Sequence, residues 1–129
     1  MSKKPESTFI AGVHRYLPKT IYAEKMANPY RGGTPDVWYS GTRSDLWIEY
    51  KFIPKIPKTS ITAALSALQQ QWLARRHSEG RNLAVIVGCP DGGVVFRDRE
   101  WEQALPSPQF TARILPRPSL ADWITTAIC

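Results

Sequence analysis

The sequence predicts an α/β domain in which a small mixed β-sheet is flanked by helices. Three observations support this class: a helical pattern near the N-terminus, two β-rich runs before a long amphipathic segment, and an uninterrupted apolar strand after it. The chain has 129 residues, which fits one domain and is long enough to bury a hydrophobic core. We therefore expect residues 1–129 to form a single domain.

The first half of the chain is expected to contain one helix followed by strands. The segment KPESTFIAGVHRYLPK has apolar residues at helical spacing, Pro5 suits its first turn and Pro18 ends it. TIYAEKM is a short strand, and ANPYRGGTP is a loop because of its Asn-Pro and Gly-Gly pairs. DVWYS and DLWIEYKFI are β-rich runs on either side of GTRS, and this arrangement predicts a β-hairpin.

The second half is expected to alternate helices and strands. After the loop PKIPKTS, Thr59 or Ser60 is a candidate N-cap for a long helix from Ile61 to about Glu79, which Gly80 terminates. The apolar stripe of this helix would be formed by Ile61, Leu65, Leu68 and Trp72. NLAVIVG is a fully buried strand, and PDGG turns the chain into VVFRD. REWEQAL is a short helix, SPQFTARILPRPS is a Pro-rich loop that can hold one edge strand, and LADWITTAI is a terminal helix.

Composition and charge narrow the range of functions. No apolar run approaches the ~20 residues that span a membrane, and MSKKPESTF lacks the apolar segment of a secretory signal. The two cysteines are too few for a disulfide framework or a zinc cage, so we expect a cytoplasmic protein. The net charge of +6 favours an acidic partner, most commonly nucleic acid. The basic residues are scattered, so folding has to assemble any positive surface.

The run DLWIEYKF carries two charged residues on one of its faces. Alternate residues of a strand share a face, so Glu49 and Lys51 point one way while Ile48 and Tyr50 point towards the core. Asp36 begins the preceding strand of the hairpin, so its carboxylate is expected beside Glu49. Two carboxylates held together repel each other unless a cation joins them, and Mg²⁺ or Mn²⁺ is bound by such oxygens. With a lysine to orient water or stabilise charge on a phosphate, these residues are suited to phosphodiester hydrolysis.

Other interpretations of these residues stay open. Glu49 and Lys51 can form ordinary surface ion pairs, because the acid-x-lysine spacing is common by chance. The second Pro-Asp pair, in CPDGG, is typical of a tight turn, and no acid-x-lysine follows it. The two histidines are far apart and form no metal motif. Gly32-Gly33 is not followed by the G-K-[ST] of a P-loop and is expected to let the backbone approach Asp36.

Taken together, these motifs resemble the signature of PD-(D/E)XK nucleases. TPD at residues 34–36 is similar to the PD motif, and EYK at residues 49–51 is similar to ExK. The lead-in RGGTPD and the segment LQQQWLARRHSEG resemble the VRR-NUC branch, whose later motif is matched by Gln69, Trp72 and Gly80. The resemblance covers roughly residues 6–95. We therefore expect a core at about 6–97 and a C-terminal extension at about 98–129.

The resemblance implies a restriction-endonuclease-like core with a divalent metal site. Asp36 and Glu49 would bind Mg²⁺ or Mn²⁺, Lys51 would position or activate the water, and Gln69 would lie near them. An acid on the first helix often completes the site in this family, and Glu6 is the candidate; its position equally suits a favourable charge at a helix N-terminus. The resemblance also implies a DNA substrate, in structured or branched form, a homodimer, and a bacterial or bacteriophage setting.

Basic residues that flank this site in sequence are candidates for contacts with phosphates. They are Arg31, Lys55, Lys58, Arg75 and Arg76. The sequence therefore predicts a metal-dependent nuclease that hydrolyses DNA. Two alternatives remain: a nucleic-acid-binding module of the same fold that does not cut, and a basic protein that binds or inhibits a partner.

Overall fold

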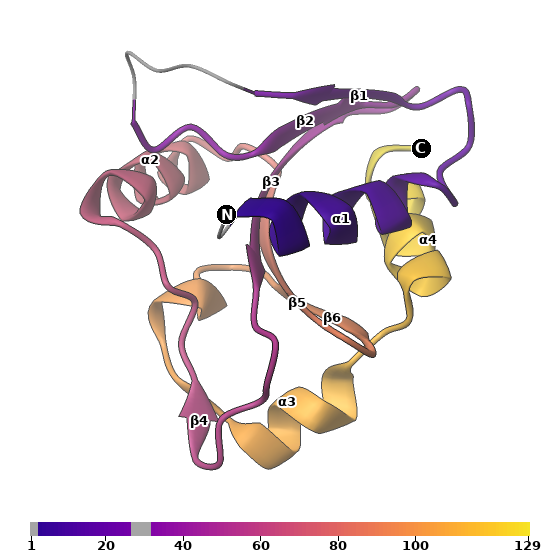
Figure 1. Cartoon of the computed structure of the whole chain (residues 1–129). Coiled ribbons are helices and arrows are strands. Elements are labelled where there is room, and N and C mark those ends of the chain that lie inside the picture. Colours follow the sequence, from indigo (N-terminus) through magenta and orange to yellow (C-terminus); the bar gives the residue numbers. More distant parts are fainter. Residues whose placement is uncertain (1–2, 27–31) are drawn as a thin grey trace.

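The computed structural model describes residues 3–26 and 32–129 (Figure 1). Its helices are α1 (Lys3–His14), α2 (Ala67–Ser78), α3 (Ser107–Arg113) and α4 (Arg117–Ile128), with a short 3-10 helix, η1, at Glu100–Glu102. Its strands are β1 (Tyr22–Lys25), β2 (Val37–Ser40), β3 (Asp45–Phe52), β4 (Ser60–Ile61), β5 (Leu83–Cys89), β6 (Gly92–Phe96) and β7 (Leu105–Pro106).

A five-stranded mixed sheet in the order β1-β2-β3-β5-β6 forms the centre of the molecule. The β3–β5 pair is parallel, and the other neighbours in this sheet are antiparallel. Parallel strands need a long crossover, which here contains β4 and α2. β4 and β7 pair in a separate two-stranded sheet. β2 and β3 are antiparallel neighbours joined by a short turn, so the predicted hairpin is confirmed.

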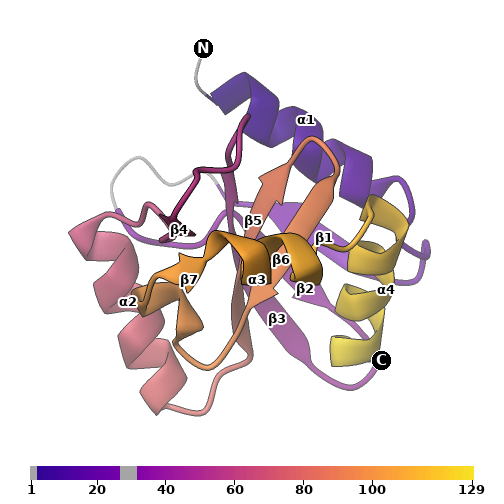
Figure 2. The ribbon, with the colours of Figure 1, turned by 90° about the horizontal axis from the view of Figure 1, so that it is seen from below.

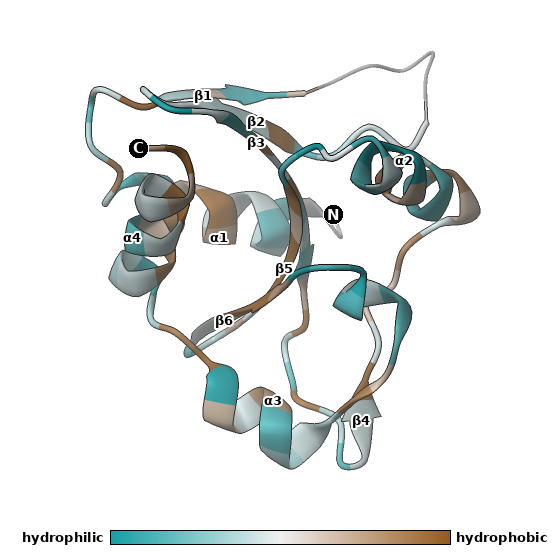
Figure 3. Cartoon of the chain, turned by 180° about the vertical axis from the view of Figure 1, so that it is seen from behind, coloured by the Kyte–Doolittle hydropathy of each residue, from teal (hydrophilic) through white to brown (hydrophobic). Residues whose placement is uncertain are grey.

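Helices cover both faces of the sheet, and each face has its own hydrophobic cluster (Figures 1 and 2). α1 and α4 pack on one face, where Leu46, Ile48 and Tyr50 of β3 are fully buried. α2 and α3 contribute Leu73 and Phe110 to the cluster on the other face. β5 is buried along its whole length, as predicted, because both of its faces are covered. Figure 3 shows the hydrophobic residues concentrated along these central strands.

The long helix predicted from Ile61 begins later, at Ala67. Ile61 belongs to β4 instead, where it pairs with Leu105 and is buried in the second cluster. The N-cap is Ser66, not Thr59 or Ser60. The predicted apolar stripe is correct for Trp72, which packs against the second cluster, but wrong for Leu68, which is 55% exposed; Leu73 is the buried residue of α2. Gly80 does follow the helix with a positive φ of 80°, as expected for a terminator.

Two other boundaries differ from the prediction. The first helix ends at His14, and residues 15–17 continue as tight turns instead of reaching Pro18. The Pro-rich segment expected to be a loop forms α3 and the start of α4, and each helix has a proline in its first turn. Proline is favoured there because its φ already suits a helix and its missing N–H is not needed. In the described residues, no helix is long and apolar enough to cross a membrane.

Candidate active site

β3 presents Glu49 and Lys51 on the sheet face that α2 covers. This orientation agrees with the alternation read from the sequence, since Ile48 and Tyr50 lie in the opposite cluster. The Glu49 side chain is only 2% exposed, whereas that of Lys51 is 23% exposed. The distance from Lys51 Nζ to Glu49 Oε2 is 3.4 Å. The ammonium group therefore touches the buried carboxylate and remains accessible to solvent.

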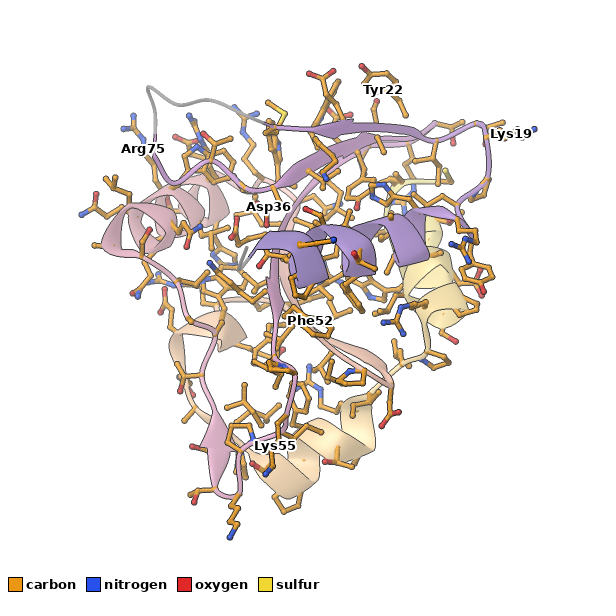
Figure 4. All side chains as sticks on the ribbon, viewed as in Figure 1. Lys19, Tyr22, Asp36, Phe52, Lys55 and Arg75 are labelled. Carbon is orange, nitrogen blue, oxygen red and sulfur yellow. The ribbon has the colours of Figure 1, made fainter. Side chains whose placement is uncertain are left out.

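Asp36 directly precedes β2 and lies opposite Glu49 in the hairpin. Val37 pairs with Ile48, so the next position along the two strands places Asp36 across from Glu49. The backbone N–H of Tyr50 donates a hydrogen bond of 2.8 Å to Asp36 Oδ2, which fixes the carboxylate against β3. Figure 4 shows Asp36 between the first turn of α1 and helix α2. The hairpin thus brings both carboxylates to the same part of the sheet.

Gln69 connects this site to the start of α2. Its backbone N–H donates to Ser66 Oγ at 3.1 Å, and its side-chain Oε1 accepts from the backbone N–H of Ser66 at 2.9 Å. This reciprocal pair is a capping box, and it leaves the amide nitrogen free to point elsewhere. Gln69 Nε2 donates a hydrogen bond of 2.9 Å to Glu49 Oε2. The same side chain therefore begins the helix and holds the buried carboxylate.

Gly33 lets the loop before Asp36 pack against the first turn of α2. Its φ is 93°, which is a region that favours glycine. A Cβ at this position would overlap the backbone carbonyl of Leu68. The sequence predicted that Gly32-Gly33 allows a close backbone approach near Asp36. The structure shows that the partner in this approach is the helix that carries Gln69.

The electrostatic environment raises the pKa of Glu49 to about 8. Burial is the largest cause, because it disfavours the charged form, and the carboxylate of Asp36 adds to it. Lys51 acts in the opposite direction, and Glu6 makes the smallest contribution. Within the described part of the chain, the buried Glu49 Oε1 has no hydrogen-bond partner. At neutral pH this carboxyl group therefore holds a proton unless a cation takes its place.

The residues present fit a divalent cation held by two carboxylates. The unpartnered Glu49 oxygen and the neighbouring Asp36 supply the hard oxygen ligands that Mg²⁺ and Mn²⁺ prefer. Mg²⁺ commonly uses one or two carboxylates and completes its shell with water and substrate phosphate. Among residues 3–26 and 32–129, no three His, Cys, Asp or Glu side chains form a group that could hold a metal ion. Glu6 is half-buried in the first turn of α1, and its part in a metal site stays a prediction.

A chain of hydrogen bonds lies in the core on the other face of β3. His14 Nε2 and the Tyr39 hydroxyl are 2.7 Å apart, and the hydroxyls of Tyr39 and Tyr50 are 2.6 Å apart. Burial, with a smaller effect of Lys25, lowers the pKa of His14 to about 4, so its ring is neutral at pH 7. Burial also raises the pKa of both tyrosines. The sequence gives no sign of this chain, because its members are 25 and 11 positions apart and each suits a packed core.

The basic residues predicted to contact phosphates do not gather around Asp36. Lys55 and Lys58 are exposed in the connection between β3 and β4. Figure 4 shows Lys55 and Arg75 well apart from each other and from Asp36. Arg75 and Arg76 lie in the last turn of α2, where both form ion pairs with Glu79. Arg31 lies outside the described residues.

Comparisons with known proteins identify the fold. No protein-family model matches the chain, and no curated protein matches its sequence. Among solved structures, the chain is similar to Hjc, a Holliday junction resolvase from the archaeal hyperthermophile Archaeoglobus fulgidus. The TM-score is 0.54 at 18% sequence identity, and the match covers 90% of this chain and 99% of that chain. The predicted fold class, a restriction-endonuclease-like α/β core with a small mixed sheet flanked by helices, is therefore confirmed. The assignment to the VRR-NUC branch stays a prediction.

Proposed function

We propose that this chain, which shares its fold with the Hjc resolvase, is a divalent-metal-dependent nuclease that hydrolyses phosphodiester bonds in DNA. The observation that carries this proposal is the environment of Glu49. Glu49 is a buried carboxylate with one unpartnered oxygen, an acid beside it and a lysine 3.4 Å away. This arrangement lowers the stability of the fold, so a purely structural strand would gain nothing from it. The same arrangement becomes favourable when a cation and a phosphate group complete it.

Each residue then has a defined role. Asp36 and Glu49 would hold Mg²⁺ or Mn²⁺, which would supply polarisation of the phosphate and a bound water of lowered pKa. Lys51 reaches solvent from beside Glu49 and can donate a hydrogen bond to the attacking water or to a phosphate oxygen. Gln69 is a positioning residue, because its amide holds Glu49 Oε2 from the start of α2. The N–H of Tyr50 orients Asp36 in the same way.

Branched DNA is the substrate class that we propose first, because Hjc is a Holliday junction resolvase and the two chains match over almost their whole lengths. A homodimer would allow two strands of a junction to be cut in one complex, and we include it in the proposal. The net charge of +6 supports a polyanionic substrate. Light scattering after size-exclusion chromatography measures the number of subunits directly.

Cleavage assays test the proposed activity. The purified chain is incubated with four-way-junction, linear duplex and single-stranded DNA in Mg²⁺, in Mn²⁺ or in EDTA. We expect cleavage of the junction in either metal, none in EDTA, and a loss of at least about 100-fold in Lys51→Ala, since general acid–base groups contribute at least that much. Lys19→Ala is a matched control, because it removes an exposed lysine far from Asp36 to which no role in the site is assigned. Absence of metal-dependent cleavage with all three DNAs, or undiminished cleavage by Lys51→Ala, would contradict the proposal and favour a non-cutting binding module.

A further inference from the structure

A basic pocket lies at the opposite end of β3 from Lys51. It has a volume of about 580 Å³ and lies where the β2–β3 turn, the α2–β5 connection, the end of β6 and helix α4 meet. Its lining residues include Arg43, Arg81, Arg97, Asn82 and Trp123. Figure 2 shows the β2–β3 turn beside the C-terminal end of α4, with the α2–β5 connection also in the lower part of the view. In Figure 3 the α2–β5 connection is hydrophilic.

Two of the three arginines of this pocket, Arg43 and Arg97, form no ion pair with a described carboxylate. Arg43 Nη2 donates to the carbonyl of Thr126 at 2.8 Å, which uses one of its five N–H groups. The Arg97 guanidinium lies over the ring of Trp123, with 5.4 Å between its Cζ and the ring centroid. Of the described residues, no carboxylate forms an ion pair with either arginine. Both groups are therefore held in place by contacts that leave their charge unneutralised.

The local charge balance of the pocket is positive. Arg81 Nε lies 3.8 Å from Glu79, a weak contact with an acid that Arg75 and Arg76 also share. None of the described residues that line the pocket is acidic. Asp45 is the acidic residue among the described residues that line an adjoining hollow of about 430 Å³. Three arginines with an asparagine have the chemistry that suits a phosphate group, because a guanidinium group can donate two parallel hydrogen bonds to phosphate oxygens.

The length of β3 and the length of α2 each give an approximate distance between this pocket and the candidate active site. Ser44 lines the pocket and Glu49 is five residues further along the extended chain, which corresponds to ~17 Å at ~3.4 Å per residue. Gln69, beside Glu49, is nine helical steps of 1.5 Å from Ser78 at the end of α2, which gives ~14 Å, and Gly80 lines the pocket just beyond that end. The pocket is therefore too far from Glu49 to hold the phosphate group that is cut.

We propose that this arginine pocket, lined by Arg43, Arg81 and Arg97, binds a phosphate group of the DNA substrate other than the phosphate that is cut. The inference rests on the proposed function for the identity of the ligand, because free nucleotides carry the same phosphate chemistry. A second anchor at this distance would fix the orientation of the strand on the protein, as phosphate contacts do in other DNA complexes.

Equilibrium binding tests the inference without relying on catalysis. Fluorescence anisotropy with a labelled 30-base-pair duplex and with a four-way junction is measured in EDTA across a series of salt concentrations. Arg43→Gln, Arg81→Gln, Arg97→Gln and the triple variant are compared with Arg15→Gln, an exposed arginine outside the pocket. Isothermal titration calorimetry with deoxyadenosine monophosphate measures how tightly the same proteins bind a free nucleotide. Lys51→Ala is included because it removes cutting and leaves the pocket intact.

We expect the triple variant to bind DNA at least about tenfold more weakly, because hydrogen bonds to charged groups are lost. The slope of log K against log salt should decrease in magnitude by about one, because one phosphate contact is lost, whereas Arg15→Gln should change the affinity and the slope little. Native-like DNA and nucleotide binding by the triple variant would overturn the inference. Loss of nucleotide binding with unchanged DNA binding would assign the pocket to a free nucleotide and overturn its role as a DNA anchor. Because every measurement is made in EDTA, failure of the nuclease proposal alone leaves these results unaffected.

Discussion

Replacing Glu49 with glutamine should remove a pH-dependent loss of stability from the metal-free protein. The folded pKa of Glu49 is about 8, compared with an ordinary value of 4.5. The folded state therefore keeps the proton to a higher pH than the unfolded state does. Stability is greatest below pH 4.5 and is lost as the pH rises through 8, because ionising the buried carboxyl group disfavours folding. Glutamine has nearly the same shape, keeps an oxygen for the Gln69 amide and does not ionise.

The size of this effect follows from the pKa difference. One pKa unit corresponds to about 1.4 kcal/mol, so the full shift from 4.5 to 8 is worth about 5 kcal/mol above pH 8. Between pH 5 and pH 8 the folded state binds close to one more proton than the unfolded state, so the free energy of unfolding changes by about 3.5 kcal/mol over this interval. The free energy of unfolding of the native chain should therefore fall by this amount relative to Glu49→Gln over that interval.

Urea unfolding in EDTA, followed by tryptophan fluorescence at pH 5, 6, 7 and 8, measures this difference. Other groups that titrate in the same range affect both proteins and cancel in the comparison. Adding Mg²⁺ or Mn²⁺ should restore stability to the native chain alone, by about 2.7 kcal/mol at 100 times the dissociation constant. Parallel stability curves for the two proteins from pH 5 to pH 8 would refute the argument, because Glu49 would then not be a proton acceptor of raised pKa in the folded state.

Three further perturbations have expected outcomes. His14→Gln should flatten the pH dependence of stability between pH 6.5 and about 4. In the native chain the folded ring has its pKa lowered to about 4, so as the pH falls the proton binds the unfolded state first and the free energy of unfolding drops by about 2 kcal/mol, after allowance for the partial exposure of the ring. Gln69→Ala should lower the free energy of unfolding by about 2 kcal/mol, because the side-chain part of the helix cap and the hydrogen bond to Glu49 are lost. Gln69→Glu should keep the cap but place a second carboxylate beside Glu49. It should therefore raise the pKa of Glu49 further and shift the pH profile of cleavage to higher pH. Gly33→Ala should lower the free energy of unfolding by at least about 2 kcal/mol and reduce cleavage, because the added Cβ would overlap the backbone of Leu68. Gly80→Ala has a similar φ, but its Cβ would meet nothing within 4 Å. It should lower the free energy of unfolding by about 1 kcal/mol and leave cleavage unchanged.

Each of these expectations can fail clearly. A His14→Gln protein whose stability varies with pH as in the native chain would show that the ring does not stay neutral in the fold. Equal stability of Gln69→Ala and the native chain would remove Gln69 from its position between the helix cap and Glu49. Equal effects of the two glycine substitutions would show that the loop before Asp36 is not held against α2. Urea unfolding and the junction-cleavage assay provide all three measurements.

Much of the fold could be predicted because its decisive patterns are local. The alternation in β3 places Tyr50 in one cluster and Glu49 in the other, and this depends only on the geometry of a strand. The hairpin follows from two β-rich runs separated by a short turn, and it is sufficient to place Asp36 opposite Glu49. Gly80 terminates α2 as its conformational freedom allows. These residues therefore carry their structural role in their immediate sequence context.

The parts that could not be predicted depend on contacts between distant segments. Ile61 has the spacing of a helix, but it pairs with Leu105, more than forty residues later, and this pairing turns the segment into β4. The arginine pocket combines Arg43, Arg81 and Arg97 from three different connections, so no local motif could reveal it. The ion pairs of Arg75 and Arg76 with Glu79 form within one helical turn, and the role of these arginines in phosphate contacts stays a prediction.

The parallel pairing of β3 with β5 has a consequence for the order of folding. β1, β2 and β3 are consecutive antiparallel neighbours, so they can associate through short loop closures, and Asp36 can meet Glu49 at that stage. The hydrogen bond from Gln69 to Glu49 depends on the crossover that joins the two parallel strands, which is intrinsically slower. We expect a refolding chain to bring its carboxylates together first and to gain the restraint of α2 afterwards. The assembled site would therefore be a late marker of folding, later than the hairpin that contains its acids.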